Sequence, residues 1–66
     1  MAQHPTTPPR LIRLAEVRKL TSLSASEIYR RLAARRFPKQ IRLGARSVAW
    51  SEAEIHQWIA DQINEG

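Results

Sequence analysis

The sequence predicts a mainly α-helical domain with one small β-hairpin, and three observations support this prediction. The chain has 66 residues, which suits a single domain with a small core. Three segments repeat apolar residues at spacings of three and four, as a helix does on the face that packs against a core. Residues 39–50 instead alternate apolar and other side chains, as half-buried strands do. We expect an ordered domain over residues 10–66 after a disordered tail at residues 1–9, which holds three prolines.

The first predicted helix covers residues 14–20 and follows a short extended segment at residues 11–13. Leu14, Val17 and Leu20 share one face of this helix and are expected in the core. Its first turn holds an acid and its last turn holds two bases, an order that the helix dipole favours. Those two bases are equally compatible with solvent and with a DNA phosphate.

The second predicted helix covers residues 24–36 and begins after a turn of only three residues. Ser24 and Glu27 fit the S-x-x-E capping box, in which each side chain satisfies a backbone N–H at the helix start. Pro38 is expected to end the helix near Arg36, because the residue before a proline avoids helical geometry. Two helices joined by so short a turn predict a helix-turn-helix, whose second helix enters the major groove of DNA.

The hairpin predicted for residues 39–50 has its turn at residues 44–46. Gly44 is expected to supply the positive φ that a tight turn favours. The residues that alternate with the apolar ones, including Ala49, are expected on the outer face. The half-buried face is predicted to consist of Ile41, Leu43, Val48 and Trp50.

Two arginines project from this hairpin, which would form the wing of a winged helix-turn-helix. Arg42 lies on its first strand and Arg46 lies at its tip. A bare hairpin tip has little packing to do, so we expect Arg46 to contact a phosphate or the minor groove. The alternative for Arg46 is a solvated turn residue.

The third predicted helix begins at Ser51, which again forms an S-x-x-E pattern, with Glu54. Trp50 and Trp58 are expected to anchor the core rather than to stack on bases. The apolar stripe of this helix closes the core over the first two helices and the hairpin, and it consists of Ile55, Trp58, Ile59 and Ile63.

The charge of the chain is strongly polarised along the sequence. All eleven Lys and Arg residues lie between Arg10 and Arg46, together with only Glu16 and Glu27. Residues 51–66 hold four acids and neither Lys nor Arg. The two parts therefore have net charges of +9 and −4, which indicates one face for an anionic partner and one that avoids it. The alternative is a solvated basic surface without a partner.

Several classes of function have no support in the sequence. The chain lacks cysteine, so disulfides and thiolate metal sites are excluded, and its two histidines lie far apart. We therefore expect no metal and no cofactor. No acid pair, activated nucleophile or glycine-rich phosphate loop indicates an enzyme. No apolar run approaches the ~20 residues of a membrane helix, and no signal peptide is evident, so we expect a cytoplasmic protein associated with the nucleoid.

Five blocks of residues stand out in order: Leu11-Ile12-Arg13-Leu14-x-Glu16-Val17, Thr21-x-Leu23-Ser24-x-Ser26-x-Ile28-Tyr29, Phe37-Pro38-Lys39, Leu43-Gly44-x-Arg46-x-Val48-x-Trp50 and Glu54-Ile55-x-x-Trp58-Ile59. In order and spacing these blocks resemble the AlpA family of phage- and island-encoded regulators. That family is related to excisionases and to MerR-type winged helix-turn-helix proteins. The resemblance covers about residues 10–62 and implies a DNA-binding protein that acts as a transcriptional regulator, an excision factor or both.

The predicted partner is double-stranded DNA, with the second helix in the major groove and the wing on the backbone or minor groove. The resemblance implies that Ser24, Ser26, Tyr29 and Arg30 lie at the major groove, and that Arg46 lies at the wing tip. For Tyr29, a position in the core is the alternative. The candidate DNA-binding residues are Ser24, Ser26, Glu27, Tyr29, Arg30, Arg31, Arg35, Lys39, Arg42 and Arg46.

Two further functions remain open at this point. The first is a recombination directionality factor, or excisionase, that binds DNA and recruits an integrase. The second is a protein-interaction adaptor whose acidic third helix binds a recombinase or an RNA polymerase subunit. Whether the protein is a transcriptional regulator or an excisionase, a domain this small contacts only a modest area of DNA. We therefore expect self-association on repeated sites.

Overall fold

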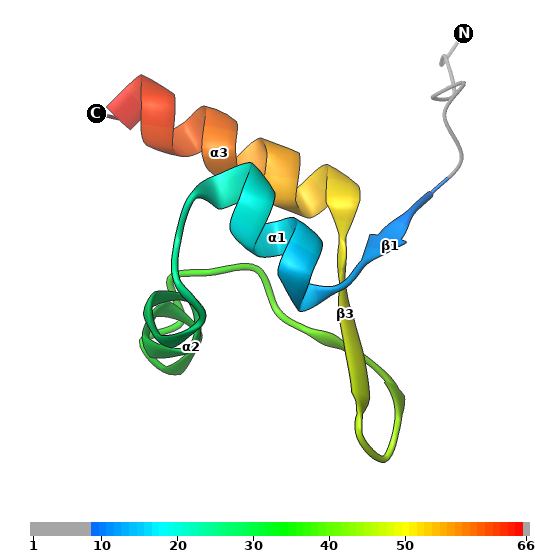
Figure 1. Cartoon of the computed structure of the whole chain (residues 1–66). Helices are drawn as coiled ribbons and strands as arrows, with labels where there is room; N and C mark the ends of the chain where they lie inside the picture. The colour runs from blue at the N-terminus through cyan, green and yellow to red at the C-terminus, as the bar shows by residue number, and fades with distance from the viewer. Residues whose placement is uncertain (1–8, 66) are drawn as a thin grey trace, which may run out of the picture.

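A computed structural model describes residues 9–65 of the chain (Figure 1). Residues 1–8 of the predicted tail lie outside the described part, so the tail stays a prediction. The elements confirm the predicted fold class of three helices with a small β-hairpin as a wing. In chain order they are β1 (Leu11–Ile12), α1 (Leu14–Thr21), α2 (Ala25–Ala33), β2 (Ile41–Gly44), β3 (Ser47–Ser51) and α3 (Glu52–Glu65).

A three-residue turn joins α1 to α2, and local hydrogen bonds close it. Ser22 takes the left-handed conformation, with φ of 66°, and its N–H donates to the carbonyl of Arg18 at 2.8 Å. Thr21 Oγ1 donates to the carbonyl of Val17 at 2.8 Å and accepts the N–H of Leu23 at 3.2 Å. Glycine usually occupies such a left-handed position after a helix. The hydrogen bonds therefore hold a conformation that serine takes only at a cost.

The start of α2 differs in one respect from the predicted capping box. Ser24 is the N-cap, and its side chain accepts the N–H of Glu27 at 3.2 Å, as predicted. The Glu27 carboxylate is instead engaged with the guanidinium groups of Arg30 and Arg31. Those two positive partners lie three and four residues further along the helix, which is close enough to compete for the carboxylate.

Helix α2 ends earlier than the sequence predicts. The helix ends at Ala33 rather than near Arg36, so Pro38 does not determine its end. Arg35 has a φ of 60°, and the N–H of Arg36 donates to the carbonyl of Arg31 at 2.8 Å. This hydrogen bond across a left-handed residue is the Schellman termination, in which glycine is the usual left-handed residue. Here an arginine takes the left-handed position, so no glycine marks this helix end in the sequence.

The strands form one antiparallel sheet in the order β1-β3-β2, with β3 in the centre. Ile12 of β1 lies opposite Trp50 of β3. The N–H of Glu52 donates to the carbonyl of Arg10 at 2.9 Å, and the two side chains form an ion pair at 3.3 Å. The sheet therefore joins the segment before α1 to the start of α3.

The hairpin closes without the glycine conformation that the sequence predicted. Gly44 does not have a positive φ, and neither do Ala45 and Arg46 in the turn. Between two successive pairs of the β2–β3 ladder, β2 contains one residue more than β3, namely Leu43. Such a bulge bends its strand and increases the local twist, which accounts for closure of the turn without a left-handed residue.

The core is a cluster of buried side chains from every described element except β2. Both tryptophans anchor it, as predicted. The indole N–H of Trp50 donates to the carbonyl of Pro38 at 3.1 Å, and that of Trp58 donates to the carbonyl of Arg36 at 3.0 Å. The segment after α2 is therefore tied to β3 and to α3. The buried cluster consists of Ile12, Val17, Ile28, Phe37, Trp50 and Ile55.

Four side chains have a burial opposite to that predicted. Ile41 and Leu43 are exposed, because β2 is an edge strand of a hairpin that extends beyond the helices (Figure 1). Ala49 is buried on the central strand β3, directly before the fully buried Trp50. Ile63 is 74% exposed, since the last turns of α3 extend past the cluster. Within residues 9–65, no helix has both the length and the apolar composition required to cross a bilayer.

Candidate nucleic-acid interface

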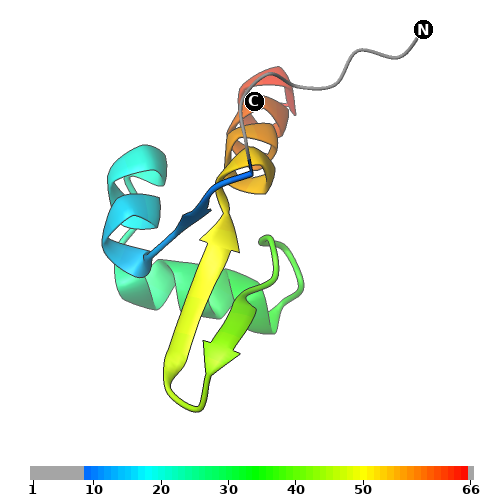
Figure 2. The same cartoon turned by 90° about the vertical axis from the view of Figure 1, so that its right-hand side faces the viewer.

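The two predicted DNA-contacting elements lie on the part of the molecule that is remote from α3. In Figures 1 and 2, α2 and the tip of the β2–β3 hairpin both lie below α1, and α3 runs along the top. Seven of the eleven basic residues belong to residues 30–46, which run from α2 to the hairpin turn. The four acids after residue 51 belong to α3. The charge asymmetry of the sequence therefore corresponds to a separation in space.

The first turn of α2 presents two hydroxyl groups. Ser24 and Ser26 are exposed, and their Oγ atoms are 3.2 Å apart. The N-cap position of Ser24 places both hydroxyls beside the unpaired N–H groups of the helix start. A helix N-terminus of this kind suits an anionic oxygen such as that of a phosphate.

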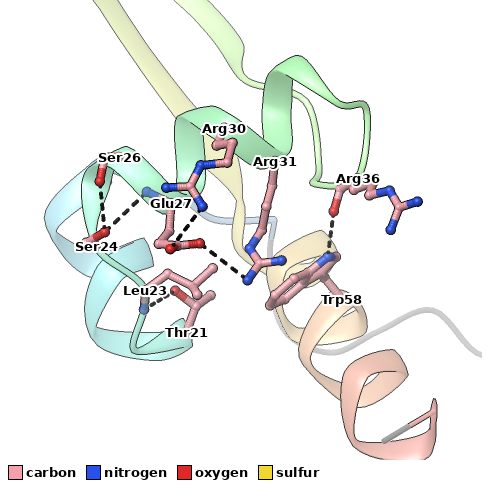
Figure 3. A network of polar contacts seen from close by, with 9 residues as sticks. All are labelled: Thr21, Leu23, Ser24, Ser26, Glu27, Arg30, Arg31, Arg36 and Trp58. Carbon is pink, nitrogen blue, oxygen red and sulfur yellow. Dashed lines mark hydrogen bonds and ion pairs between the residues drawn. The ribbon is translucent and has the colours of Figure 1, made fainter.

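Two arginines follow on the next turn, and the guanidinium groups of both contact the carboxylate of Glu27 (Figure 3). Arg30 Nη1 is 3.2 Å from Glu27 Oε2, and Arg31 Nη2 is 3.5 Å from Glu27 Oε1. The side chain of Arg30 is 69% exposed, whereas that of Arg31 is 38% exposed. The Nε atom of Arg31 is enclosed and has no hydrogen-bond partner. Arg30 is therefore the more accessible arginine of this pair.

Tyr29 belongs to the surface of α2 and not to the core. Its side chain is 45% exposed, whereas the preceding residue, Ile28, is fully buried. The core alternative for Tyr29 is therefore wrong. Its phenol is accessible beside Arg30 on the second turn of the helix.

The wing and the segment before it contain the other four candidates. Arg46 is exposed in the hairpin turn. Arg42 Nη1 donates to the carbonyl of Ala45 at 3.2 Å, so this guanidinium is folded back and braces the turn. Arg35 and Lys39 are exposed on the connection between α2 and β2, where both line one shallow depression. The structure thus separates the candidates into a group on α2, a group on this connection and a group at the hairpin tip.

One basic group near the helix-turn-helix was not among the candidates. Arg18 and Lys19, in the last turn of α1, line an open depression beside Ser22 and Ser24. These two bases therefore lie next to the N-terminus of α2. Their position at the end of the helix before the turn was the signal available in the sequence, because the turn is too short to separate them from the second helix.

Comparisons with known proteins agree with this architecture. A family profile described as "Prophage CP4-57 regulatory protein (AlpA)" matches residues 10–63. An uncharacterized protein of Enterobacteria phage P4, ORF88, is 40% identical over 57 residues, which cover 86% of this chain and 65% of that protein. The DNA-binding transcriptional activator AlpA of Escherichia coli strain K12 is 36% identical over 59 residues, which cover 80% of this chain and 84% of that protein. No solved structure matches the chain.

The chain spans slightly less than two thirds of the length of the phage P4 protein. The region matched by the family profile nevertheless includes β1, all three helices and the hairpin, so it covers both the core and the candidate interface. This match confirms the family that the sequence resembles. The chain belongs to the AlpA family of prophage regulatory proteins.

Proposed function

We propose that this protein is a sequence-specific regulator of transcription that binds double-stranded DNA. In this proposal α2 lies in the major groove and the β2–β3 wing lies on the backbone or in the minor groove. The main support is the exposed Arg30 on a helix whose capped N-terminus presents Ser24 and Ser26 to the same solvent region. A relative 36% identical to this chain is named a DNA-binding transcriptional activator. Family membership also favours a DNA-binding regulator over an enzyme.

The proposed contacts divide into two kinds with different effects. Ser24, Ser26, Lys39 and Arg46 would contact phosphates, and such contacts do not distinguish sequences. The two cationic side chains among them would also release counterions, which makes affinity depend on salt. Arg30 would donate to a base edge, and a bidentate bond from arginine to guanine contributes about 1–3 kcal/mol of discrimination. Affinity and specificity would therefore arise from different residues of the same surface.

The size of the domain predicts that it acts in more than one copy. A single small DNA-binding module buries roughly 600–1,000 Å² of protein surface. Useful specificity then needs two or more copies on direct or inverted repeats, spaced near one helical turn of DNA. We therefore expect cooperative binding with self-association on repeated sites.

Footprinting on the DNA upstream of the protein's own gene tests the proposal. The expected result is protection of repeated sequences, together with a gel-shift series whose complexes form cooperatively. Purified protein that forms only one weak complex, with equal affinity for any sequence, would contradict the proposal. The test needs no partner protein, so it also separates direct DNA binding from an adaptor function.

A second candidate function is direction of site-specific excision through recruitment of an integrase. It is favoured by α3, which contains four acids and no Lys or Arg, lies away from the candidate interface and exposes Ile63. An RNA polymerase subunit is the corresponding partner in transcription control. An excision assay with a candidate integrase, with and without this protein, tests the second function, and equal excision in both reactions would exclude it.

A further inference from the structure

We propose that Glu27 is a positioning residue that holds Arg30 for a guanine edge and opposes its use on a phosphate. This inference rests on the proposed DNA-binding function and extends it, because it assigns sequence selectivity to an acidic residue in a basic surface. The residue would bind no DNA itself. Its effect would be transmitted through the two arginines that it contacts.

The geometry gives the two carboxylate oxygens of Glu27 separate tasks. Oε1 faces Arg31 at 3.5 Å, and Oε2 faces Arg30 at 3.2 Å (Figure 3). Arg31 is the less exposed arginine, and its Nε is enclosed by the protein. Arg31 is therefore the fixed partner, which keeps the carboxylate in place. Arg30 is the more accessible partner, since two thirds of its side chain is exposed.

The bond to Glu27 uses only part of the Arg30 guanidinium. The hydrogen bond comes from Nη1, and a guanidinium has five N–H donors in a planar fork. The donors on Nη2 and Nε therefore remain available for the two acceptors of a guanine edge. On a matching site, Arg30 can bind guanine while it keeps its bond to Glu27.

A phosphate places a different demand on the same side chain. In this proposal Arg30 must leave Glu27 to reach the backbone, and the carboxylate, then paired with Arg31 alone, lies near phosphates of the same charge. Non-specific binding therefore loses an ion pair and gains a repulsion that specific binding avoids. Glu27 thus lowers affinity for random duplex more than affinity for the matching site, which raises the ratio between them.

The chain provides a matched control for this proposal. Glu54 occupies the same place in the first turn of α3 that Glu27 occupies in α2, and its N–H donates to the Oγ of Ser51 at 3.2 Å. Each carboxylate interacts favourably with the positive end of its helix dipole. Glu54 lies on the helix remote from the candidate interface. Glu54→Gln therefore reproduces the loss of charge at a helix start without affecting the two arginines.

The experiment compares wild type, Glu27→Gln and Glu54→Gln on the footprinted site and on a random duplex, at several salt concentrations. For Glu27→Gln we expect affinity for the random duplex to rise about three- to tenfold and the specificity ratio to fall about tenfold. The dependence of log K on log salt for random duplex should steepen by about 0.9, because one more phosphate contact forms. Glu54→Gln should leave the specificity ratio and the salt dependence unchanged.

Glu27→Asp provides a second variant that retains the charge and shortens the reach. It should also lower the specificity ratio, because the shorter carboxylate cannot contact both arginines at the wild-type distances. An unchanged or increased ratio in both Glu27 variants would overturn the inference while leaving the proposed function intact, and so would an equal loss of affinity for both duplexes. Failure of the wild type to prefer any sequence would refute the proposed function itself.

Discussion

The indole N–H of Trp58 donates to the main-chain carbonyl of Arg36 at 3.0 Å, which joins α3 to the segment that leaves α2. The ring of Trp58 also meets that of Phe37 edge-on, with centroids 5.0 Å apart and an interplanar angle of 63°. Such an aromatic arrangement is favourable. These two contacts fix the end of the proposed recognition helix relative to the C-terminal helix.

The two tryptophan hydrogen bonds should have unequal effects on stability. Trp58→Phe removes a bond at an exposed position and should lower the free energy of unfolding by about 1 kcal/mol. Trp50→Phe removes a partly buried hydrogen bond. Because the Trp50 side chain is itself fully buried, this variant should lower the free energy of unfolding by about 1–3 kcal/mol. Urea unfolding followed by circular dichroism measures both. A larger loss for Trp58→Phe would contradict this assignment of burial.

Substitutions of Arg35 should change stability in opposite directions. A left-handed residue other than glycine costs roughly 1–2 kcal/mol, and glycine costs about 0.5–1 kcal/mol through the unfolded chain. Arg35→Gly should therefore raise the free energy of unfolding by up to about 1 kcal/mol. Arg35→Val should lower it by more than 1 kcal/mol, because a β-branched side chain suits this φ poorly. Thermal or urea unfolding distinguishes the two, and a stable valine variant would argue against the left-handed helix end.

The exposure of Ile63 predicts a large difference between two isoleucines of α3. Ile55→Ala should cost about 2–5 kcal/mol, because Ile55 is fully buried in the central cluster. Ile63→Ala should change stability by no more than about 0.5 kcal/mol. Urea unfolding tests this difference, because variants with the same m-value can be compared directly by their unfolding midpoints. A substantial loss in Ile63→Ala would mean that the last turns of α3 pack on something, such as a second copy of the chain.

Arg30 and Arg46 should differ in their effect on DNA binding. Arg30→Ala should weaken binding to the footprinted site by about 1–3 kcal/mol and affect random duplex much less, because it removes contacts to a base. Arg46→Ala should weaken binding to both duplexes similarly and reduce the salt slope by about 0.9. Fluorescence anisotropy titrations at several salt concentrations provide these values. Equal losses in Arg30→Ala would make that residue a phosphate contact only.

The periodic segments of the sequence were sufficient to predict the helices and their order. The spacing of Leu14, Val17 and Leu20 gave α1, and the spacing of Ile55, Trp58 and Ile59 gave α3. Local patterns of this kind predict structure well because each residue is compared only with its neighbours along one element.

The errors occurred where an outcome depends on distant parts of the chain or on an unusual residue. The alternation around Ile41 and Leu43 was correct for a strand, but only the sheet order shows that this strand lies at an exposed edge. The end of α2 depends on Arg35 in a conformation for which the sequence signal is normally glycine.

The sequence predicts which residues form the candidate interface better than it predicts the hydrogen bonds and ion pairs of their side chains. Ser24, Ser26, Arg30 and Arg46 are exposed on the elements expected for them. The bond from Arg42 to the hairpin turn could not be inferred, because it depends on the bulge. The pairing of Glu27 with two arginines follows a spacing visible in the sequence, but the capping pattern offered a competing partner for the same carboxylate.

The pairing of β1 with β3 has a consequence for the folding kinetics of the domain. Helix α1, its turn and α2 are formed by contacts between near neighbours, which assemble quickly. Leu11 and Ser51, by contrast, are opposite each other in the sheet although forty positions separate them, so a long loop must close before they meet. We infer that the helical pair forms early and that docking of the first strand is the slow, final step. Until that strand docks, the helical pair would be joined to the wing only through the segment that follows α2.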